Sequence, residues 1–101
     1  MRVLLKSERI AVERAICRHF DVTEKDLRSR RRPLVIARPR QVAFYVAHKL
    51  TGASLKALGN AFGKDDGTVR WGINTITNLI DTDARFRLVV ESIEKEVAAC
   101  L

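Results

Sequence analysis

The sequence predicts an all-α fold of about six helices with short connections and a helix-turn-helix in its middle. Three observations support this. Apolar residues recur at intervals of three and four along several segments, which is the spacing of one helix face. Residues that cap helices stand between those segments. No stretch alternates between apolar and polar residues for long enough to predict a strand.

Two helices are expected in the first third of the chain. An amphipathic helix is predicted over residues 7–20, because four apolar residues share one face of it: Val12, Ala15, Ile16 and Phe20. A short helix through Ser29 should follow. Thr23 with Asp26 three residues later has the spacing of a capping box, which marks the beginning of that helix.

The third predicted helix begins at about Arg38, because Pro39 fits the first turn of a helix, where its missing N–H costs nothing. The helix should end at Leu50, before Gly52, which suits a left-handed cap. Three residues are expected on its core face: Val42, Val46 and Leu50.

Residues 54–80 have the sequence pattern of a helix-turn-helix. Ser54 is a good cap for a helix over residues 55–62, and a glycine-containing turn follows. Asp65 or Asp66 then caps a longer helix that reaches about Ile80. A short helix, a turn and a longer helix make up this motif. Asp83 should begin a last helix that runs to near Cys100.

The composition indicates one folded domain that spans residues 1–101, with an N-terminal helix inside residues 1–20. A hydrophobic content of 47% fits a chain with a packed core. Cys17 and Cys100 stand far apart without a CxxC motif, and the first residues are too short an apolar run for a membrane span. We therefore expect a cytoplasmic protein.

The basic stretch at residues 28–41 reads RSRRRPLVIARPRQ and holds six arginines and no acidic residue. It accounts for most of the net charge of +7, because the other thirteen Lys and Arg face twelve Asp and Glu. Guanidinium groups suit phosphates and guanine edges. Pro33 should keep Arg32 out of a helix, at the tip of an extended loop. The sequence thus favours nucleic acid as partner over a solvated loop without a ligand.

Three motifs that would indicate an enzyme or a metal site do not hold. Residues 59–65 resemble a phosphate-binding P-loop, but three residues instead of four separate the glycines and no Ser or Thr follows Lys64. His19 and His48 lie too far apart for a zinc site. Adjacent aspartates at a helix start are more often caps than catalytic metal ligands. We expect no catalysis, no cofactor and no metal.

From about residue 10 to residue 97 the sequence resembles the C-terminal DNA-binding domain of the DnaA family of bacterial replication initiators. The run ARPRQ at residues 37–41 carries most of the resemblance. Further matches agree in order and spacing: Arg30-Arg31-Arg32, Leu50-Thr51, Ser54-Leu55, Leu58-Gly59, Ala61-Phe62-Gly63, Lys64-Asp65 and Thr68-Val69. The fold that this resemblance implies is the helix-turn-helix arrangement also found in the Trp repressor.

The resemblance implies a helix-turn-helix that reads a short DNA site in the major groove, while a loop arginine enters the adjacent minor groove. Arg32 falls at the position of that arginine. Arg40 and Gln41 fall on base- and phosphate-contacting positions, and Leu55 and Lys56 near the backbone and thymine methyl groups. The full set of expected DNA-binding residues is Arg30, Arg31, Arg32, Arg40, Gln41, His48, Leu55, Lys56, Lys64, Asp65, Asp66, Thr68 and Arg70.

Two departures from the family pattern concern the recognition helix. The family signature reads approximately Gly-Arg-Asp-His-Thr-Thr-Val, and this chain has Asp66 in place of the His and Gly67 in place of the first Thr. A carboxylate can accept a hydrogen bond from cytosine N4, but it repels phosphate and cannot serve guanine. Each lost base contact is worth about 1–3 kcal/mol of discrimination. We therefore expect DNA binding to persist with a changed sequence preference.

The leading hypothesis is a non-enzymatic, sequence-biased binder of double-stranded DNA. We expect this protein to lack the initiator's ATPase module, to be associated with the nucleoid, and to act in replication or transcription. The alternative is a protein-interaction module, in which the first or last helix binds the initiator or another replication or transcription protein. RNA binding is not favoured, because no exposed aromatic platform is evident. Trp71 is expected in the core or at its edge, and a base-stacking role is the less favoured alternative for it. Membrane binding is not favoured either, because no basic amphipathic helix carries bulky apolar residues.

Overall fold

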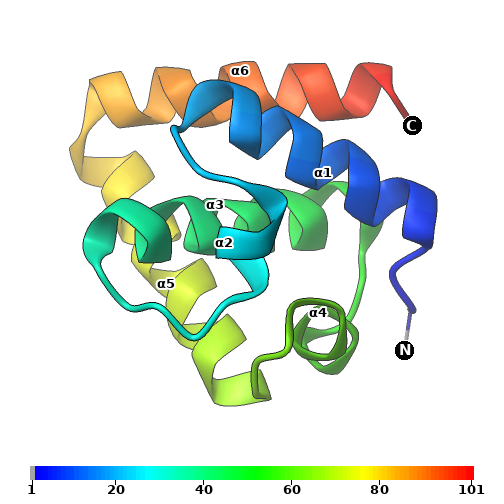
Figure 1. Cartoon of the computed structure of the whole chain (residues 1–101). Helices are drawn as coiled ribbons and strands as arrows, with labels where there is room; N and C mark the ends of the chain where they lie inside the picture. Colours follow the sequence, from blue (N-terminus) through cyan, green and yellow to red (C-terminus); the bar gives the residue numbers. More distant parts are fainter. Residues whose placement is uncertain (1) are drawn as a thin grey trace.

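The computed structural model describes residues 2–101, which form six helices around one hydrophobic core (Figure 1). The helices are α1 (Lys6–His19), α2 (Glu24–Arg28), α3 (Leu34–Thr51), α4 (Leu55–Phe62), α5 (Asp66–Thr82) and α6 (Ala84–Ala99). The predicted all-α class with a central helix-turn-helix is confirmed. In residues 2–101 the only β-type pairing is an isolated bridge between Arg2 and Ala53.

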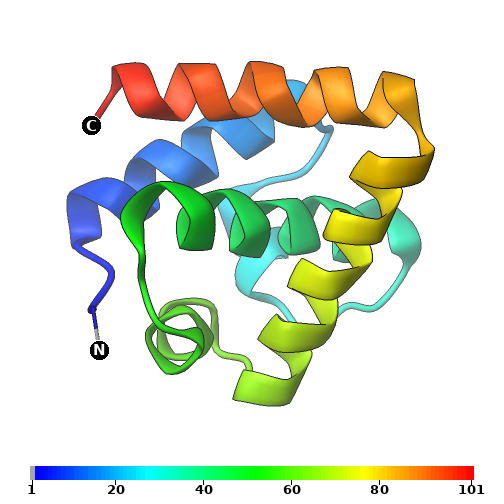
Figure 2. The same ribbon diagram turned by 180° about the vertical axis from the view of Figure 1, so that it is seen from behind.

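Helix α3 is the centre of the fold and packs against each of the other five helices. In Figures 1 and 2, α1 and α6 lie side by side along the top, α3 runs beneath them, and α5 crosses α3. Helix α4 and the beginning of α5 lie at the opposite end of the molecule from α6. The helix-turn-helix is therefore presented to solvent on the side away from α1 and α6.

The core is built mainly from the buried face of α3 and the residues that pack onto it. Phe44 of α3 and Phe62 of α4 are both buried, with ring centroids 5.5 Å apart and an edge-to-face angle of 77°. This aromatic pair fixes α4 against α3. Val42 and Val46 are fully buried as predicted, and Leu50 is half-buried.

Helix boundaries follow the capping residues of the sequence. The predicted capping box is present, because Thr23 Oγ1 accepts from the Asp26 N–H (3.1 Å) and Asp26 Oδ2 accepts from the Thr23 N–H (3.0 Å). Gly52 and Gly63 end α3 and α4 in the left-handed conformation, with φ of 72° and 67°. Three more residues cap helices through side-chain oxygens: Ser54, Asp65 and Asp83.

The prediction that α3 begins at Arg38 is wrong. The helix begins at Leu34, so only residues 29–33 of the basic stretch form a loop. The carbonyl of Pro33 accepts from Ala37 N (2.8 Å) and so starts the helix. Pro39 then lies inside α3, where it forgoes one intrahelical hydrogen bond. Burial of Ile36, which is 4% exposed, stabilises the extra turn.

Candidate nucleic-acid interface

The turn between α4 and α5 is held close against α4. Asp65 caps α5 by accepting from the Thr68 N–H (2.7 Å), and this hydrogen bonding lowers the pKa of Asp65. The Lys64 N–H donates to the Gly59 carbonyl (2.8 Å). A Cβ atom at position 59 would collide with the Lys64 carbonyl oxygen, so glycine is required there. The P-loop-like spacing of residues 59–65 therefore belongs to a tight helix-turn-helix.

Four arginines are exposed at or in the loop between α2 and α3: Arg28, Arg30, Arg31 and Arg32. The loop at residues 29–33 is called the arginine loop below. Arg28, the last residue of α2 before this loop, faces α1, and its Nε atom lies 3.8 Å from the buried carboxylate of Glu13. Burial raises the pKa of Glu13, and the charges of Arg9 and Arg28 oppose this rise.

Arg40 supports the arginine loop from beneath. Its side chain is buried, with 6% of the residue exposed, and burial lowers its pKa. The guanidinium donates to four backbone carbonyls: Asp26 (2.9 Å), Leu27 (2.8 Å), Ser29 (2.9 Å) and Arg31 (3.2 Å). A guanidinium has five N–H donors, so most of its donors are used inside the protein. This arrangement does not favour the direct DNA contact that the family resemblance implied for Arg40.

Lys64 joins the arginine loop to the helix-turn-helix. Its Nζ donates to the Ser29 carbonyl at 2.5 Å, a contact between residues that are 35 positions apart. Burial lowers the pKa of Lys64, and repulsion from Arg40, Arg30 and Arg32 lowers it further. The ammonium group thus lies among the positive charges of Arg30, Arg32 and Arg40, where an anion from outside would be stabilised.

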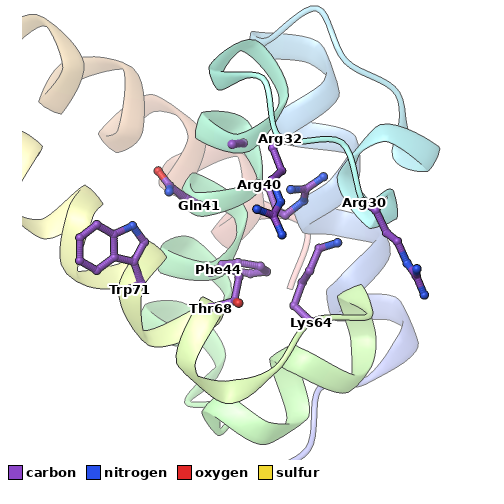
Figure 3. A pocket seen from close by; sticks show the side chains of 9 residues that line it. Arg30, Arg32, Arg40, Gln41, Phe44, Lys64, Thr68 and Trp71 are labelled. Carbon is purple, nitrogen blue, oxygen red and sulfur yellow. The ribbon is translucent and has the colours of Figure 1, made fainter.

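A groove of about 560 Å³ runs between the arginine loop and α5 (Figure 3). Its lining combines four cationic side chains with polar and aromatic ones: Arg30, Arg32, Ala37, Arg40, Gln41, Phe44, Lys64, Thr68 and Trp71. The structure therefore brings together six of the expected DNA-binding residues from the loop, α3, the turn and α5. A surface of this charge and shape suits a polyanion.

The other expected site residues lie outside this groove. Arg31, Lys56, Asp65, Asp66 and Arg70 are exposed. Leu55 is half-buried at the beginning of α4. His48 is exposed near the end of α3, where its Nδ1 lies 2.8 Å from the Ala53 carbonyl oxygen. Asp66 and Arg70 are four residues apart and share one side of α5, next to the groove rather than in it.

The prediction that Trp71 lies in the core or at its edge is wrong. It is 70% exposed on α5 and lines the groove opposite the arginine loop (Figure 3). Ala37 and Phe44 are the other groove residues that were not expected in the site, and Phe44 is almost fully buried. The exposure of Trp71 also removes the argument that the chain offers no exposed aromatic group. Helical spacing did contain a signal, because Trp71 follows the exposed Gly67 by one turn.

The structure offers no group of three His, Cys, Asp or Glu side chains that could hold a metal ion in residues 2–101. Across the same residues, none of the helices is long and apolar enough to span a bilayer. Cys17 and Cys100 are both unpaired thiols.

The fold and the basic groove define a helix-turn-helix domain with a charged surface for a polyanion. The family described as bacterial dnaA protein helix-turn-helix matches residues 10–76, and the chain belongs to that family. Membership supports binding to double-stranded DNA.

Similar proteins come from several bacteria and are chromosomal replication initiator proteins DnaA. The one from Gluconobacter oxydans is 39% identical over 85 residues, which cover 83% of this chain and 18% of that protein. The one from Caldanaerobacter subterraneus subsp. tengcongensis is 36% identical over 86 residues, covering 85% and 19%. The one from Bartonella quintana is 37% identical over 94 residues, covering 89% and 19%. The chain thus spans about a fifth of the length of these relatives.

Proposed function

We propose that this chain binds double-stranded DNA with a sequence bias and acts as a regulatory factor at replication origins or promoters, on the nucleoid in the cytoplasm. The observation that carries the proposal is the groove in which Arg30, Arg32, Arg40 and Lys64 converge beside α5. A polyanion is the ligand that such a field binds best.

The two sides of the groove have different tasks in this proposal. The exposed arginines of the loop neutralise phosphate charge, and Arg32 does so from inside the minor groove, where the potential of both backbones is negative. Helix α5 lies in the neighbouring major groove and presents Asp66, Thr68 and Arg70, all of which are exposed near its beginning. This division follows the usual one between positioning contacts to phosphates and reading contacts to bases.

In this proposal Arg40 is a positioning residue. Its hydrogen bonds fix the carbonyls on both sides of the loop, so the exposed arginines start from an ordered backbone. An ordered loop loses less conformational freedom on binding DNA, which favours affinity. Lys64 has the same effect through Ser29 and also adds a positive charge.

The sequence preference is proposed to differ from that of the initiator. Asp66 can accept from cytosine N4, and Gly67 offers no side chain for a base contact. Arg70 can donate to guanine. The proposal assigns no ATP hydrolysis to these residues, because Gly59 and Gly63 are needed for the helix-turn-helix itself.

Fluorescence anisotropy with two labelled duplexes tests this function. One duplex carries the DNA site of the DnaA initiator and the other a scrambled site, each at two salt concentrations. Preference for the initiator site by more than tenfold would support competition at origins. Equal binding with a steep salt dependence would support a DNA-binding factor with a changed preference. Absence of binding at moderate salt would contradict the proposal.

A second candidate function is docking of a replication or transcription protein. The exposed residues of α1 are all polar, so the first helix offers no apolar docking face: Lys6, Ser7, Arg14, Arg18 and His19. Helix α6 does expose apolar side chains, with Leu88 63% and Val89 38% exposed. A pull-down of the purified initiator after nuclease digestion, repeated with Leu88→Ser, would separate the two functions.

A further inference from the structure

Trp71 is the largest apolar side chain that the described residues leave exposed, and nothing in the fold explains its exposure. Tryptophan is usually buried over most of its surface, yet Trp71 is 70% exposed. It stands in the second turn of a regular helix of 17 residues, so its position is rigid. An exposed indole that lines the same groove as four cationic side chains points to a ligand that covers it.

The position of Trp71 on α5 indicates the direction of that ligand. The buried residues of α5 are Val69, Gly72 and Ile76, and residues 67, 71 and 74 lie on the opposite face at 100° per residue. Trp71 therefore lies on the outer face of the helix, one turn after Gly67.

Gly67 leaves the outer face of the first turn of α5 without a side chain. A Cβ atom at position 67 would meet only Asp65 Oδ1, at 3.7 Å, and φ of Gly67 is not positive. The fold therefore tolerates a side chain at this position, and glycine near a helix start is not required by the backbone. Without a side chain at position 67, the outer face of this turn is free for a partner to approach Trp71.

The surroundings of Trp71 are those of the proposed DNA interface. Trp71 lines the groove together with Arg32, Gln41 and Thr68 (Figure 3). Three chemical groups of a duplex could meet an indole at this place. Phosphate oxygens prefer the cations, and base faces are closed by stacking inside the duplex. The remaining group is the thymine 5-methyl, the apolar feature of the major-groove edge.

We infer that Trp71 packs against a thymine 5-methyl group in the major groove and is a specificity-determining residue of this chain. The inference rests on the proposed function. The contact would add to the reading contacts proposed for Asp66, Thr68 and Arg70, and it would favour sites with a thymine opposite the second turn of α5.

The tightest-binding duplex is first selected with the purified chain from a pool of random sequences. Each thymine of that duplex is then replaced in turn by uracil, which lacks only the methyl group, and affinity is measured by anisotropy. We expect uracil at one or two neighbouring positions to weaken binding about fourfold, since a buried methyl-sized group contributes about 0.8 kcal/mol. In Trp71→Ala this difference should vanish, and in Trp71→Phe part of it should remain.

Tryptophan fluorescence gives an independent readout, because Trp71 is the single tryptophan of the chain. Saturation with the selected duplex should shift or quench the emission, and the duplex with uracil at the sensitive position should change it less. Arg87→Ala, an exposed arginine of α6, is the control that keeps both responses. Circular dichroism verifies that the Trp71 variants are folded.

Two results would overturn the inference while leaving the proposed function intact. One is binding by anisotropy without any change in Trp71 emission. The other is a uracil effect of equal size in the wild type and Trp71→Ala. If no duplex can be selected, the proposed function and this inference fail together.

Discussion

The arginine loop and the exposed face of α5 border the same groove, but they differ in the chemistry of their side chains and in the contacts that hold their backbone in place. The loop presents arginines with no acidic neighbour between residues 27 and 64, and its backbone is held from beneath by Arg40 and Lys64. The exposed face of α5 is regular helix and carries a mixture of an acid, a glycine, a cation and an indole. In the proposed function the loop would supply affinity for any duplex, and α5 would supply discrimination between sequences.

Removal of the loop's support should have the largest effect. Arg40→Ala leaves up to four backbone carbonyls without their donor, and each buried unsatisfied group costs about 1–3 kcal/mol. We expect the free energy of unfolding to fall by about 3 kcal/mol, as measured by urea denaturation. Arg40→Lys should recover only part of it, because an ammonium cannot reach all four carbonyls. Wild-type stability in both variants would show that Arg40 does not support the loop.

A substitution that displaces Lys64, which joins the arginine loop to the turn between α4 and α5, should have the next largest effect. In Gly59→Ala the new methyl group collides with the Lys64 carbonyl, and overpacking of this kind costs about 1–3 kcal/mol. The displaced Lys64 should also lose Ser29, so DNA affinity falls with stability. Gly67→Ala is the matched control, because its methyl group makes only an ordinary contact with Asp65 Oδ1 (3.7 Å) and should stabilise α5 by up to about 1 kcal/mol. Thermal denaturation of both variants tests this, and equal effects would contradict it.

The exposed face of α5 can be altered without disturbing the loop. Asp66→His restores the residue type of the family signature and removes a negative charge from the interface. We expect affinity for the initiator's site to rise about fivefold, which corresponds to about 1 kcal/mol, and affinity for a scrambled duplex to rise less. Competition anisotropy with the two duplexes measures the ratio. An equal rise for both would mean that Asp66 acts only through its charge.

Features of the fold that depend on residues close together in the sequence could be predicted, and features that depend on contacts between distant residues could not. The capping box of Thr23 and Asp26 and the glycine ends of α3 and α4 are decided within a few residues, and they were predicted. The beginning of α3 was not, because it depends on the burial of Ile36. The charge of the basic stretch predicted a site for a polyanion there, and Arg30, Arg32 and Arg40 of this stretch line the groove. The sequence could not separate Arg40 from its neighbours, because its partners lie 9 to 14 residues away along the chain.

The smallest expected effect lies outside both regions, at the beginning of α1. Glu8 accepts from Arg2 (2.8 Å) and from the Leu5 N–H (2.9 Å), and the hydrogen bond from Arg2 is the main cause of its lowered pKa. Because its pKa is lowered, ionised Glu8 stabilises the fold at pH values above the ordinary pKa of glutamate. This stabilisation is lost as the pH falls through the pKa of Glu8 in the folded protein. Glu8→Gln should cost about 1 kcal/mol at pH 7 and nothing at strongly acidic pH. Urea denaturation at both pH values measures this, and DNA binding at pH 7 should stay unchanged.

The salt dependence of DNA affinity in Arg32→Ala tests the central claim most directly. Each neutralised phosphate contributes about 0.9 to the slope of log K against log salt concentration. We expect a steep slope for the wild type, a slope lower by about 0.9 with weaker binding in Arg32→Ala, and the wild-type slope in Arg87→Ala. The same slope and affinity in all three proteins would contradict the claim that the arginine loop binds the DNA backbone.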